Sequence, residues 1–378
     1  MQISVVHPSE LGETELAVWA SFQRHSEVFA NPFLSPEFTV AAGRFRPHAR
    51  VAVLSEGSGI TGFFPFERRR LGGGAPIAAG LNDCQGLVHA PGFVWDPQQL
   101  LRGCRLAAWH FDHLVAGQVP FRPYQKTAFP SPIMDFREGF EAYLASLRKR
   151  SPQFLKNLFY KQRKLVRDAG KLRFEYDSRD REEWQLVIRW KSDQYRRTGR
   201  SDRFAWPGVR ELVEYLLDTR SEGFRGMLSM LYAHDSPVAG FILLCSDDVA
   251  VDWFPAYNPE FARYSPGFLA RLRVAEAAAA TGIRYLEMGR GPRDVYKQRF
   301  KSGDLIVFEG RILRRSPAAV CQWARNAPAR QLRQLVTTHP RLLTAADRVL
   351  YRYGRVRTTL RSTPSVARLR WKRCAADE

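Results

Sequence analysis

The order of patterned segments in the second half of the chain most strongly constrains the fold. Residues 249–256 form an apolar run of strand type, and residues 266–281 carry a helical pattern that begins at Pro266 and stops before Gly282. Residues 283–288 then form a second apolar run. A strand, a helix and a strand in this order predict a β-α-β crossover.

The segments around this crossover complete the prediction for the second half. A basic helix over 153–169, ending at Gly170, precedes them. The further expected elements are a strand at 172–176, helices at 182–197 and 209–220, a hairpin of 226–233 and 237–245, a short helix at 295–300 and a last strand at 305–312. Strands and helices mixed in this way predict an α/β fold with a mixed sheet.

The first half repeats part of this order. Ser35-Pro36 is a helix-start signal, and residues 50–54 and 60–66 are apolar runs joined by a Gly/Ser-rich turn, which predicts a hairpin. The returning strands share a pattern, because Ile60–Phe64 and Val238–Ile242 both read apolar, small, Gly, Phe, apolar. The order of elements favours two copies of one unit, although this pattern is also a common way for a strand to begin.

Charge is concentrated in two segments. The 378 residues include 58 Lys and Arg against 38 Asp and Glu, a net charge of +20. Residues 314–378 carry a net +12 and residues 148–173 a net +9, so the remainder of the chain is close to neutral. Two basic segments on a neutral body predict local contact with something anionic, for which cofactor phosphates, a membrane face and RNA are candidates.

Within the basic tail, residues 341–361 have the spacing of an amphipathic helix with one arginine-rich face. Such a helix either lies on anionic lipid or packs on the body with its arginines in solvent. The sequence leaves both readings open.

Several classes of protein are excluded by composition. With 45% hydrophobic and 12% aromatic residues the chain can bury sizeable cores, so general disorder is excluded. The five cysteines show no CxxC spacing, and no apolar run approaches 18 residues. We therefore expect no disulfide framework, no structural zinc site and no spanning helix, and a cytoplasmic location with peripheral contact to the inner membrane as an option.

The segment 252–267 carries the clearest chemical signal. It links the strand to the crossover helix, and Ser265-Pro266-Gly267 opens that helix with a capping hydroxyl, a proline and a residue without a side chain. Free N–H groups at a helix start attract anions, and Arg263 adds a charge nearby. An ordinary capped helix can have the same composition, so these residues alone do not identify an anion-binding site.

This segment resembles the acyl-CoA-binding segment of the GNAT (GCN5-related N-acetyltransferase) superfamily. Over residues 26–312 the chain resembles the CelD-like acetyltransferases of cellulose and exopolysaccharide biosynthesis, in the FemAB-like tandem branch. The segments that carry this resemblance are Asn31–Phe38, Gly62–Phe66, Trp109–Leu114, Trp190–Tyr195 with Thr198-Gly199, Tyr264–Gly267, and Gly289–Gly291 with Tyr296-Lys297. The resemblance implies two acyltransferase folds in tandem, an acyl-CoA donor and a sugar or polysaccharide precursor as acceptor.

The resemblance also implies a division of the chain. Residues 1–147 form a GNAT-like domain with a structural or acceptor-binding role, 148–313 form the acyl-CoA-binding domain, and 314–378 form a basic helical appendage. The donor loop departs from the superfamily pattern, because Gly267-Phe268-Leu269-Ala270 replaces the usual pair of a glycine and a small residue. The first half has only Asp96-Pro97 at the start of its equivalent helix, which favours a donor site in the second half.

The resemblance implies roles for individual residues. None of these roles follows from the residue taken by itself. Tyr296 is the candidate proton donor to the departing thiolate, and Glu287 and Asp252 are candidate general bases. The candidate donor-binding residues are Arg263, Tyr264, Ser265, Gly267 and Phe268. The candidate substrate-binding residues are Tyr257, Arg290 and Lys297, although Arg290 and Lys297 also fit solvated loop charges.

Two further groups of residues resemble a metal site and a cysteine nucleophile, but the evidence for either is weaker. His110 and His113 flank Asp112 in an apolar run, and they lack a third metal ligand, so we expect a packed turn with satisfied imidazoles and no metal. Cys84 has no identifiable histidine partner and is expected to be buried.

The sequence therefore predicts an acyltransferase that moves an acyl group from coenzyme A to an amine or hydroxyl of a sugar precursor. Aminoacyl transfer from aminoacyl-tRNA is an alternative, in which the basic segments meet RNA, although we expect nucleic acid not to be a partner. A membrane-docked, inactive subunit of a polysaccharide synthase is another.

Overall fold

The computed structural model describes residues 1–290 and 295–314, and the predicted tail helix at 341–361 lies outside them. The elements of the first half are β1 (Gln2–Val6), α1 (Glu13–Arg24), α2 (Pro36–Phe45), β2 (Ala49–Glu56), β3 (Gly59–Arg69), β4 (Gly73–Pro76), β5 (Val88–His89), α3 (Pro97–Gly103), β6 (Ala108–Val115) and β7 (Gln125–Asp135). Two helices, α4 (Phe140–Arg150) and α5 (Pro152–Ala169), lead into the second half.

The second half begins with the edge strand β8. Its elements are β8 (Leu172–Glu175), α6 (Arg181–Arg197), α7 (Val209–Asp218), β9 (Arg220–Ser221), β10 (Phe224–Ala233), β11 (Ser236–Cys245), β12 (Val249–Tyr257), α8 (Pro266–Ala280), β13 (Tyr285–Glu287), α9 (Val295–Phe300) and β14 (Gly303–Leu313). Each helix and strand that the sequence pattern predicts between residues 153 and 313 is present, with ends that differ by a few residues.

All these strands belong to one mixed sheet, whose order is β1-β2-β3-β4-β6-β14-β7-β13-β12-β11-β10-β8. This order reads the same from both edges: each half runs from an antiparallel edge strand through a hairpin to a parallel pair, β4 with β6 and β12 with β13. The similar segments Ile60–Phe64 and Val238–Ile242 lie in β3 and β11, which are the returning strands of equivalent hairpins. The predicted α/β fold with a mixed sheet and two similar halves is confirmed.

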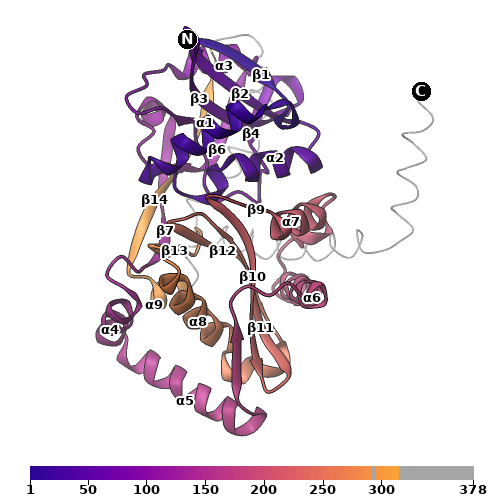
Figure 1. The fold of residues 1–378 in the computed structure, drawn as a ribbon, viewed down its shortest axis with the longest axis vertical. Helices are drawn as coiled ribbons and strands as arrows, with labels where there is room; N and C mark the ends of the chain where they lie inside the picture. Colours follow the sequence, from indigo (N-terminus) through magenta and orange to yellow (C-terminus); the bar gives the residue numbers. More distant parts are fainter. Residues whose placement is uncertain (291–294, 315–378) are drawn as a thin grey trace, which may run out of the picture.

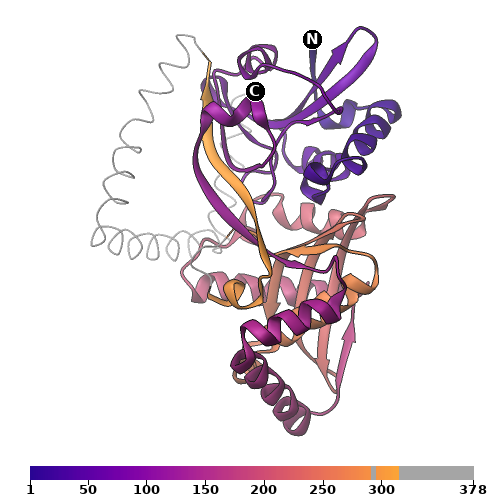
Figure 2. The same ribbon diagram turned by 90° about the vertical axis from the view of Figure 1, so that its left-hand side faces the viewer.

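The two central strands are exchanged between the halves. Strand β14, which ends the second half, pairs with β6 of the first half, and β7, which ends the strands of the first half, pairs with β13 of the second. The two also pair with each other from Gly303↔Ile133 to Gly310↔Gln125. Figure 2 shows β7 and β14 running side by side from one half to the other. The sheet is therefore continuous across the centre of the molecule.

Helices cover both faces of the sheet. One core cluster joins both halves, because α1, α2, α6 and α7 all pack on the same side (Figure 1). A second cluster lies under α4, α5 and α8, and a third under α3. Helix α5 buries Leu155, Leu158 and Leu165, and it exposes basic residues such as Lys156 and Arg163. None of the helices in the described part of the chain has both the length and the hydropathy needed to span a bilayer.

Local signals explain the helix starts. Ser35 Oγ accepts a hydrogen bond from the Phe38 N–H at 3.1 Å, and Asp96 Oδ1 accepts one from Gln99 at 2.7 Å, so α2 and α3 begin as predicted. The expectation for α8 is wrong in one detail. Ser265 has a left-handed backbone with φ 54° and its side chain makes no cap, because this backbone turns the hydroxyl away from the first N–H groups.

Candidate active site

A split in the sheet creates the candidate site. The parallel strands β12 and β13 pair only from Val249↔Tyr285 to Val251↔Glu287. Beyond Val251, β12 pairs with β11 alone among the described residues, and its register shifts near Trp253, where a bulge bends the strand. The free edge of β12 therefore faces open space rather than another strand.

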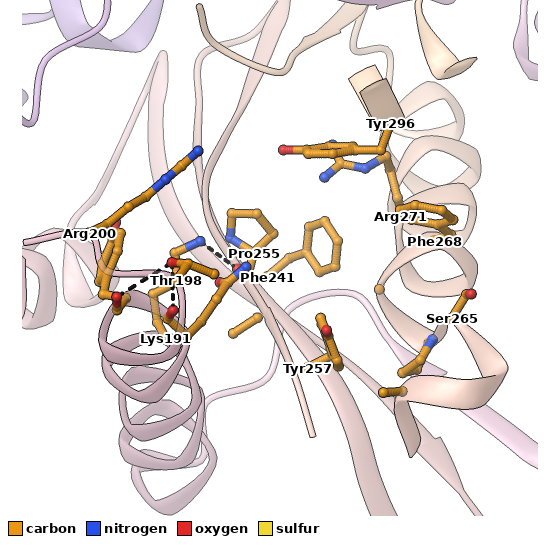
Figure 3. Close-up of a pocket in the computed structure, with 16 residues that line it drawn as sticks. Lys191, Thr198, Arg200, Phe241, Pro255, Tyr257, Ser265, Phe268, Arg271 and Tyr296 are labelled. Carbon is orange, nitrogen blue, oxygen red and sulfur yellow. Dashed lines mark hydrogen bonds between the residues drawn. The ribbon is translucent and has the colours of Figure 1, made fainter. Parts of the chain in front are cut away.

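That space is a cavity of about 440 Å³ between α6, β12, α8 and α9 (Figure 3). Its lining residues are Lys191, Gln194, Tyr195, Thr198, Arg200, Phe241, Pro255, Ala256, Tyr257, Ala262, Ser265, Pro266, Gly267, Phe268, Arg271 and Tyr296. The structure thus brings five of the predicted site residues together here, namely Tyr257, Ser265, Gly267, Phe268 and Tyr296.

The start of α8 forms one end of this cavity. The Ser265 hydroxyl lies 2.8 Å from Lys161 Nζ of α5, which donates a hydrogen bond to it. A Cβ on Gly267 would lie 3.6 Å from Tyr257 Cδ1, so a small side chain fits there but a long one would enter the cavity. A second cavity of about 290 Å³, lined in part by Lys161 and Arg299, shares Ser265 and Phe268 with the first.

A buried lysine lies across the cavity. Lys191 of α6 is only 9% exposed, and its Nζ donates a hydrogen bond of 2.8 Å to the Pro255 carbonyl on the free edge of β12. Burial lowers the pKa of Lys191 to about 7, with the neighbouring Arg200 and Arg271 adding to the effect and the Asp252 carboxylate opposing it. The ammonium therefore loses its proton near neutral pH.

An ion pair links α8 to the sheet beneath the cavity. Asp252 of β12 accepts a hydrogen bond from Arg271 of α8, and the two side chains are 1% and 3% exposed. The Arg271 guanidinium also lies 5.1 Å from the centre of the Tyr296 ring, which packs against Phe268. Asp252 thus neutralises Arg271 and does not itself line the cavity.

Two of the predicted donor-binding residues lie outside the cavity lining. Tyr264 is buried and donates a hydrogen bond of 2.8 Å to Asp168 Oδ2 of α5, while the Arg263 guanidinium lies over the Tyr264 ring at 4.7 Å. Both belong to the short 3₁₀ helix Pro259–Tyr264 that precedes α8. Tyr264 holds this helix against α5, and Arg263 is exposed.

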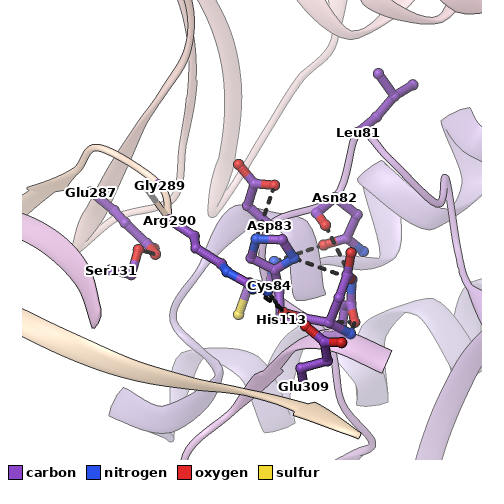
Figure 4. A network of polar contacts seen from close by, with 12 residues as sticks. Leu81, Asn82, Asp83, Cys84, His113, Ser131, Glu287, Gly289, Arg290 and Glu309 are labelled. Atoms are coloured by element: carbon purple, nitrogen blue, oxygen red, sulfur yellow. Dashed lines mark hydrogen bonds and ion pairs between the residues drawn. The ribbon is translucent and has the colours of Figure 1, made fainter. Parts of the chain in front are cut away.

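The predicted base Glu287 lies at the junction of the halves rather than in the cavity. Its carboxylate is 2% exposed and accepts a hydrogen bond from Asn31 Nδ2 at 2.6 Å. It accepts a second one from Ser131 Oγ at 2.5 Å (Figure 4). Burial raises the pKa of Glu287 to about 7, although both hydrogen bonds oppose this shift. The first half of the chain thus supplies both partners of this carboxylate.

Other charged residues gather around this junction. Arg290 donates a hydrogen bond of 3.0 Å to the Asp112 carbonyl, pairs with Glu309 at 3.3 Å and lies 3.3 Å from the centre of the Phe129 ring. Lys297 is buried, and its Nζ donates to the Gly289 carbonyl at 3.0 Å. Neither side chain lines the cavity, so their predicted substrate contacts find no support in its geometry.

The histidine group is part of the same junction. His110 and His113 lie in strand β6, so the expected turn is wrong. His113 Nδ1 lies 3.1 Å from Asp112 Oδ1, and Nε2 lies 3.6 Å from Asp83 Oδ1. Although burial opposes it, contact with these carboxylates raises the pKa of His113. Cys84 is buried as expected, and burial raises its pKa.

The cavity and the junction influence each other electrostatically. Burial is the main cause that raises the pKa of Tyr195, which lines the cavity, and the Asp83 carboxylate of the junction adds to the effect.

Sequence reasoning missed three cations of the cavity, Lys191, Arg200 and Arg271. A signal existed for two of them. Lys191 stands on the apolar face of its helix, four and seven residues after Val187 and Trp184. Arg271 is a charge between Ala270 and Leu272 in a helix whose buried residues are otherwise apolar. A cation at a position that should be buried marks a candidate functional site.

Together these residues can do two things. The cations and the N-terminus of α8 can bind an anionic ligand, because helix N–H groups and buried positive charges both favour negative charge. A carboxyl group with a pKa near 7 can take up or release a proton at physiological pH.

Comparisons with known proteins agree with this fold. Residues 152–301 match the family model described as "Acetyltransferase (GNAT) domain". No curated protein matches the chain.

The chain also matches solved structures, at low sequence identity and with TM-scores below 0.5. The C-terminal domain of a putative lysylphosphatidylglycerol synthetase from Agrobacterium fabrum has a TM-score of 0.48 and 15% identity, covering 75% of this chain and 90% of that one. FemX has a TM-score of 0.47 and 11% identity, covering 70% and 87%. A tandem GNAT protein from the clavulanic acid biosynthesis pathway has a TM-score of 0.46 and 11% identity, covering 82% and 98%. These similarities leave the substrate open.

The family match lies on the elements that build the cavity, from α5 through α9. The similarity to a GNAT acetyltransferase domain is thus confined to residues 152–301, which supply the cavity and its surrounding helices and strands.

Proposed function

We propose that the protein is an acyl-CoA-dependent N- or O-acyltransferase whose donor site is the cavity at the split between β12 and β13. The observation that carries this proposal is the coincidence of the open β12 edge, the N-terminus of α8 and Tyr296 around one cavity of about 440 Å³. The sugar or polysaccharide precursor as acceptor, and a role in cellulose or exopolysaccharide biosynthesis, rest on the sequence resemblance.

The residues of the cavity suit the parts of such a donor. The Gly267 N–H at the start of α8, with Lys161 beside Ser265, would bind phosphate oxygens. The side chains of Phe241, Phe268 and Tyr257 provide apolar contacts for the pantetheine arm. The Arg271 guanidinium stands in the cavity wall beside Tyr296, where it would contact a polar group of the ligand.

Transfer needs a proton acceptor and a proton donor. Glu287 does not line the cavity, so it would take a proton from the attacking amine or hydroxyl through one intervening water molecule as the new acyl bond forms. Tyr296 would give a proton to the sulfur as the thioester bond breaks. Positioning contributes most in this scheme, and the first half of the chain takes part through Asn31 and Ser131, which hold Glu287.

Acetyl-CoA binding tests the donor site. Acetyl-CoA should raise the melting temperature of the wild-type protein, because a ligand present at 100 times its Kd stabilises the folded state by about 2.7 kcal/mol. Gly267→Glu should abolish this shift, since a long acidic side chain would enter the cavity. Gly59→Glu is the matched control, because Gly59 is exposed and far along the chain in β3. If no acyl-CoA shifts the wild-type melting temperature, the proposal is wrong.

The basic face of α5 favours aminoacyl transfer from aminoacyl-tRNA as a second candidate. Lys156, Arg163 and Arg167 are exposed there, and Lys161 reaches the cavity. Tight tRNA binding that weakens steeply with salt, together with no response to acyl-CoA, would favour this function. Lipid binding through the tail without either response would favour an inactive membrane-docked subunit.

A further inference from the structure

One end of the cavity is more basic than a binding site for the thioester arm requires. Lys191 and Arg200 stand on one side, and Arg271 stands across from them beside Tyr296 (Figure 3). No Asp or Glu occurs among the described residues that line the cavity. This basic end lies apart from Ser265 and Gly267 at the start of α8, where the donor phosphates are proposed to bind.

The Lys191 ammonium has spare hydrogen-bonding capacity. Among the described residues, the Pro255 carbonyl is the one acceptor within hydrogen-bond distance of Nζ. An ammonium has three N–H donors, so two remain for a ligand. Because Lys191 is only 9% exposed, water can accept hydrogen bonds from these two N–H groups only inside the cavity.

Arg271 adds a second incompletely satisfied cation. It is 3% exposed, and its Nε has no hydrogen-bond partner among the described residues. The Asp252 carboxylate balances one positive charge, so the two buried cations together carry an excess of one whenever Lys191 is protonated. A buried charge without a partner is costly, and a bound anion would remove that cost.

We propose that the Lys191 end of the cavity binds a carboxylate or phosphate group of a reactant, in addition to the phosphates of the donor. Lys191 and Arg271 would hold this oxyanion between them, with Arg200 at the exposed side of the cavity. Two reactants are sources of this chemistry: an acyl group that ends in a carboxylate, or an acceptor that carries a phosphate or carboxylate. The inference rests on the proposed function only in naming these reactants.

Proton uptake provides a signature of this site. Burial holds the pKa of Lys191 near 7, and a bound oxyanion would raise it, so the protein should take up a proton as the anion binds. The charged and phenolic groups that face Lys191 come from every neighbouring element: Tyr195 and Arg200 of α6 and its following loop, Asp252 and Tyr257 of β12, Arg271 of α8, and Tyr296 and Lys297 of α9. Anion affinity should decrease as the pH rises from 6 to 9.

Titration calorimetry on the full chain tests both sources. One arm compares succinyl-CoA with acetyl-CoA and CoA. The other compares glucosamine 6-phosphate with glucosamine, with and without CoA. Each titration is repeated at pH 7.5 in two buffers of different ionisation enthalpy, which measures the protons taken up. We expect the anionic member of one pair to bind at least tenfold more tightly than its neutral counterpart, with uptake of a fraction of a proton.

Variants separate this site from the donor site. Lys191→Met and Lys191→Gln should lose both the anion preference and the proton uptake but keep CoA binding, which also shows that they fold. Arg197→Gln, an exposed arginine on the same helix outside the cavity, is the matched control and should retain both. Gly267→Glu should lose CoA binding but keep any preference for the sugar phosphate.

The two proposals fail in different ways. Equal affinities within both pairs, or an anion preference that persists in Lys191→Met, would overturn the oxyanion site and leave acetyl-CoA binding intact. Absence of binding by any CoA compound would overturn the proposed donor, while the sugar-phosphate arm would still decide the oxyanion site.

Discussion

Lys191 and Glu287 are two buried ionisable residues whose pKa values are shifted in opposite directions. Burial lowers the pKa of the lysine to about 7 and raises that of the carboxyl to about 7. Their surroundings differ, because the lysine lies beside other cations at a cavity, whereas Asn31 and Ser131 hold the carboxylate at the junction. Both groups change charge near neutral pH, which is where proton transfer and anion binding benefit most.

Glu287→Gln tests the proposed base. The variant should lower kcat about 10²- to 10⁴-fold, since an amide cannot take the proton. In the wild type, kcat/KM should rise as the pH increases through about 7, where Glu287 loses its proton, and this dependence should vanish in the variant.

Stability provides the control for the same variant. The folded pKa of Glu287 lies above its unfolded value, so the folded state binds more protons and the wild type loses stability as the pH rises from about 4.5 to about 7. The stability of Glu287→Gln relative to the wild type should therefore increase over this range. Full activity in a well-folded variant would exclude Glu287 as the base.

Between elements, the Asp252–Arg271 pair fixes α8 against β12. These two elements form the wall of the cavity, and the side chains that join them are almost completely buried. Removing one partner of a buried ion pair leaves an uncompensated charge, which is more costly than removing both.

Asp252→Asn should therefore destabilise the protein by about 3–5 kcal/mol, measured by urea denaturation at pH 7. The double variant Asp252→Asn with Arg271→Met should recover a large part of this loss. Glu276→Gln, which breaks the exposed pair with Arg273, is the control and should cost less than about 1 kcal/mol. Equal costs for the buried and exposed pairs would contradict the role given to Asp252.

For the molecule as a whole, the exchange of β7 and β14 joins the two halves into one sheet. Gly310 lies where β14 crosses against Tyr124 and Phe111 of the first half, and a Cβ at this position would overlap the Tyr124 carbonyl. The second half is thus completed by β7, and the first half is completed by β14.

Gly310→Val should consequently destabilise both halves, by about 1–3 kcal/mol or more, because the added side chain overpacks the junction. Hydrogen exchange should show reduced protection in β2 and β3 of the first half and equally in β10 and β11 of the second. Gly303→Val is the control, because a Cβ there would make only ordinary contacts with Ile133. Loss of protection in one half alone would show that the halves unfold independently.

The helices and strands were predictable because their signals are local. Pro152, Pro266 and Gly282 mark helix ends through backbone preferences that need no partner, and hairpin turns act in the same way. The repeated order of elements identified two similar units, and the resemblance in segment 264–267 directed attention to the start of α8.

The same local signals could not assemble the site. Ser265 was expected to cap α8, but its left-handed backbone directs the hydroxyl to Lys161, 104 residues earlier. Glu287 was expected to act as a general base at the site, but β13 directs its carboxylate to Asn31, 256 residues away. Tyr264 was expected to bind the donor, but its hydroxyl turns toward Asp168 of α5.

By itself, the sequence thus determined the elements, their order and the segment that opens the candidate donor site, because propensity and patterning act over a few residues. The tertiary structure decided which strands meet at the centre, that Lys191 and Arg271 face one cavity, and that the first half holds Glu287. Those arrangements depend on packing between residues far apart in the chain, for which the residues on either side carry no local signal.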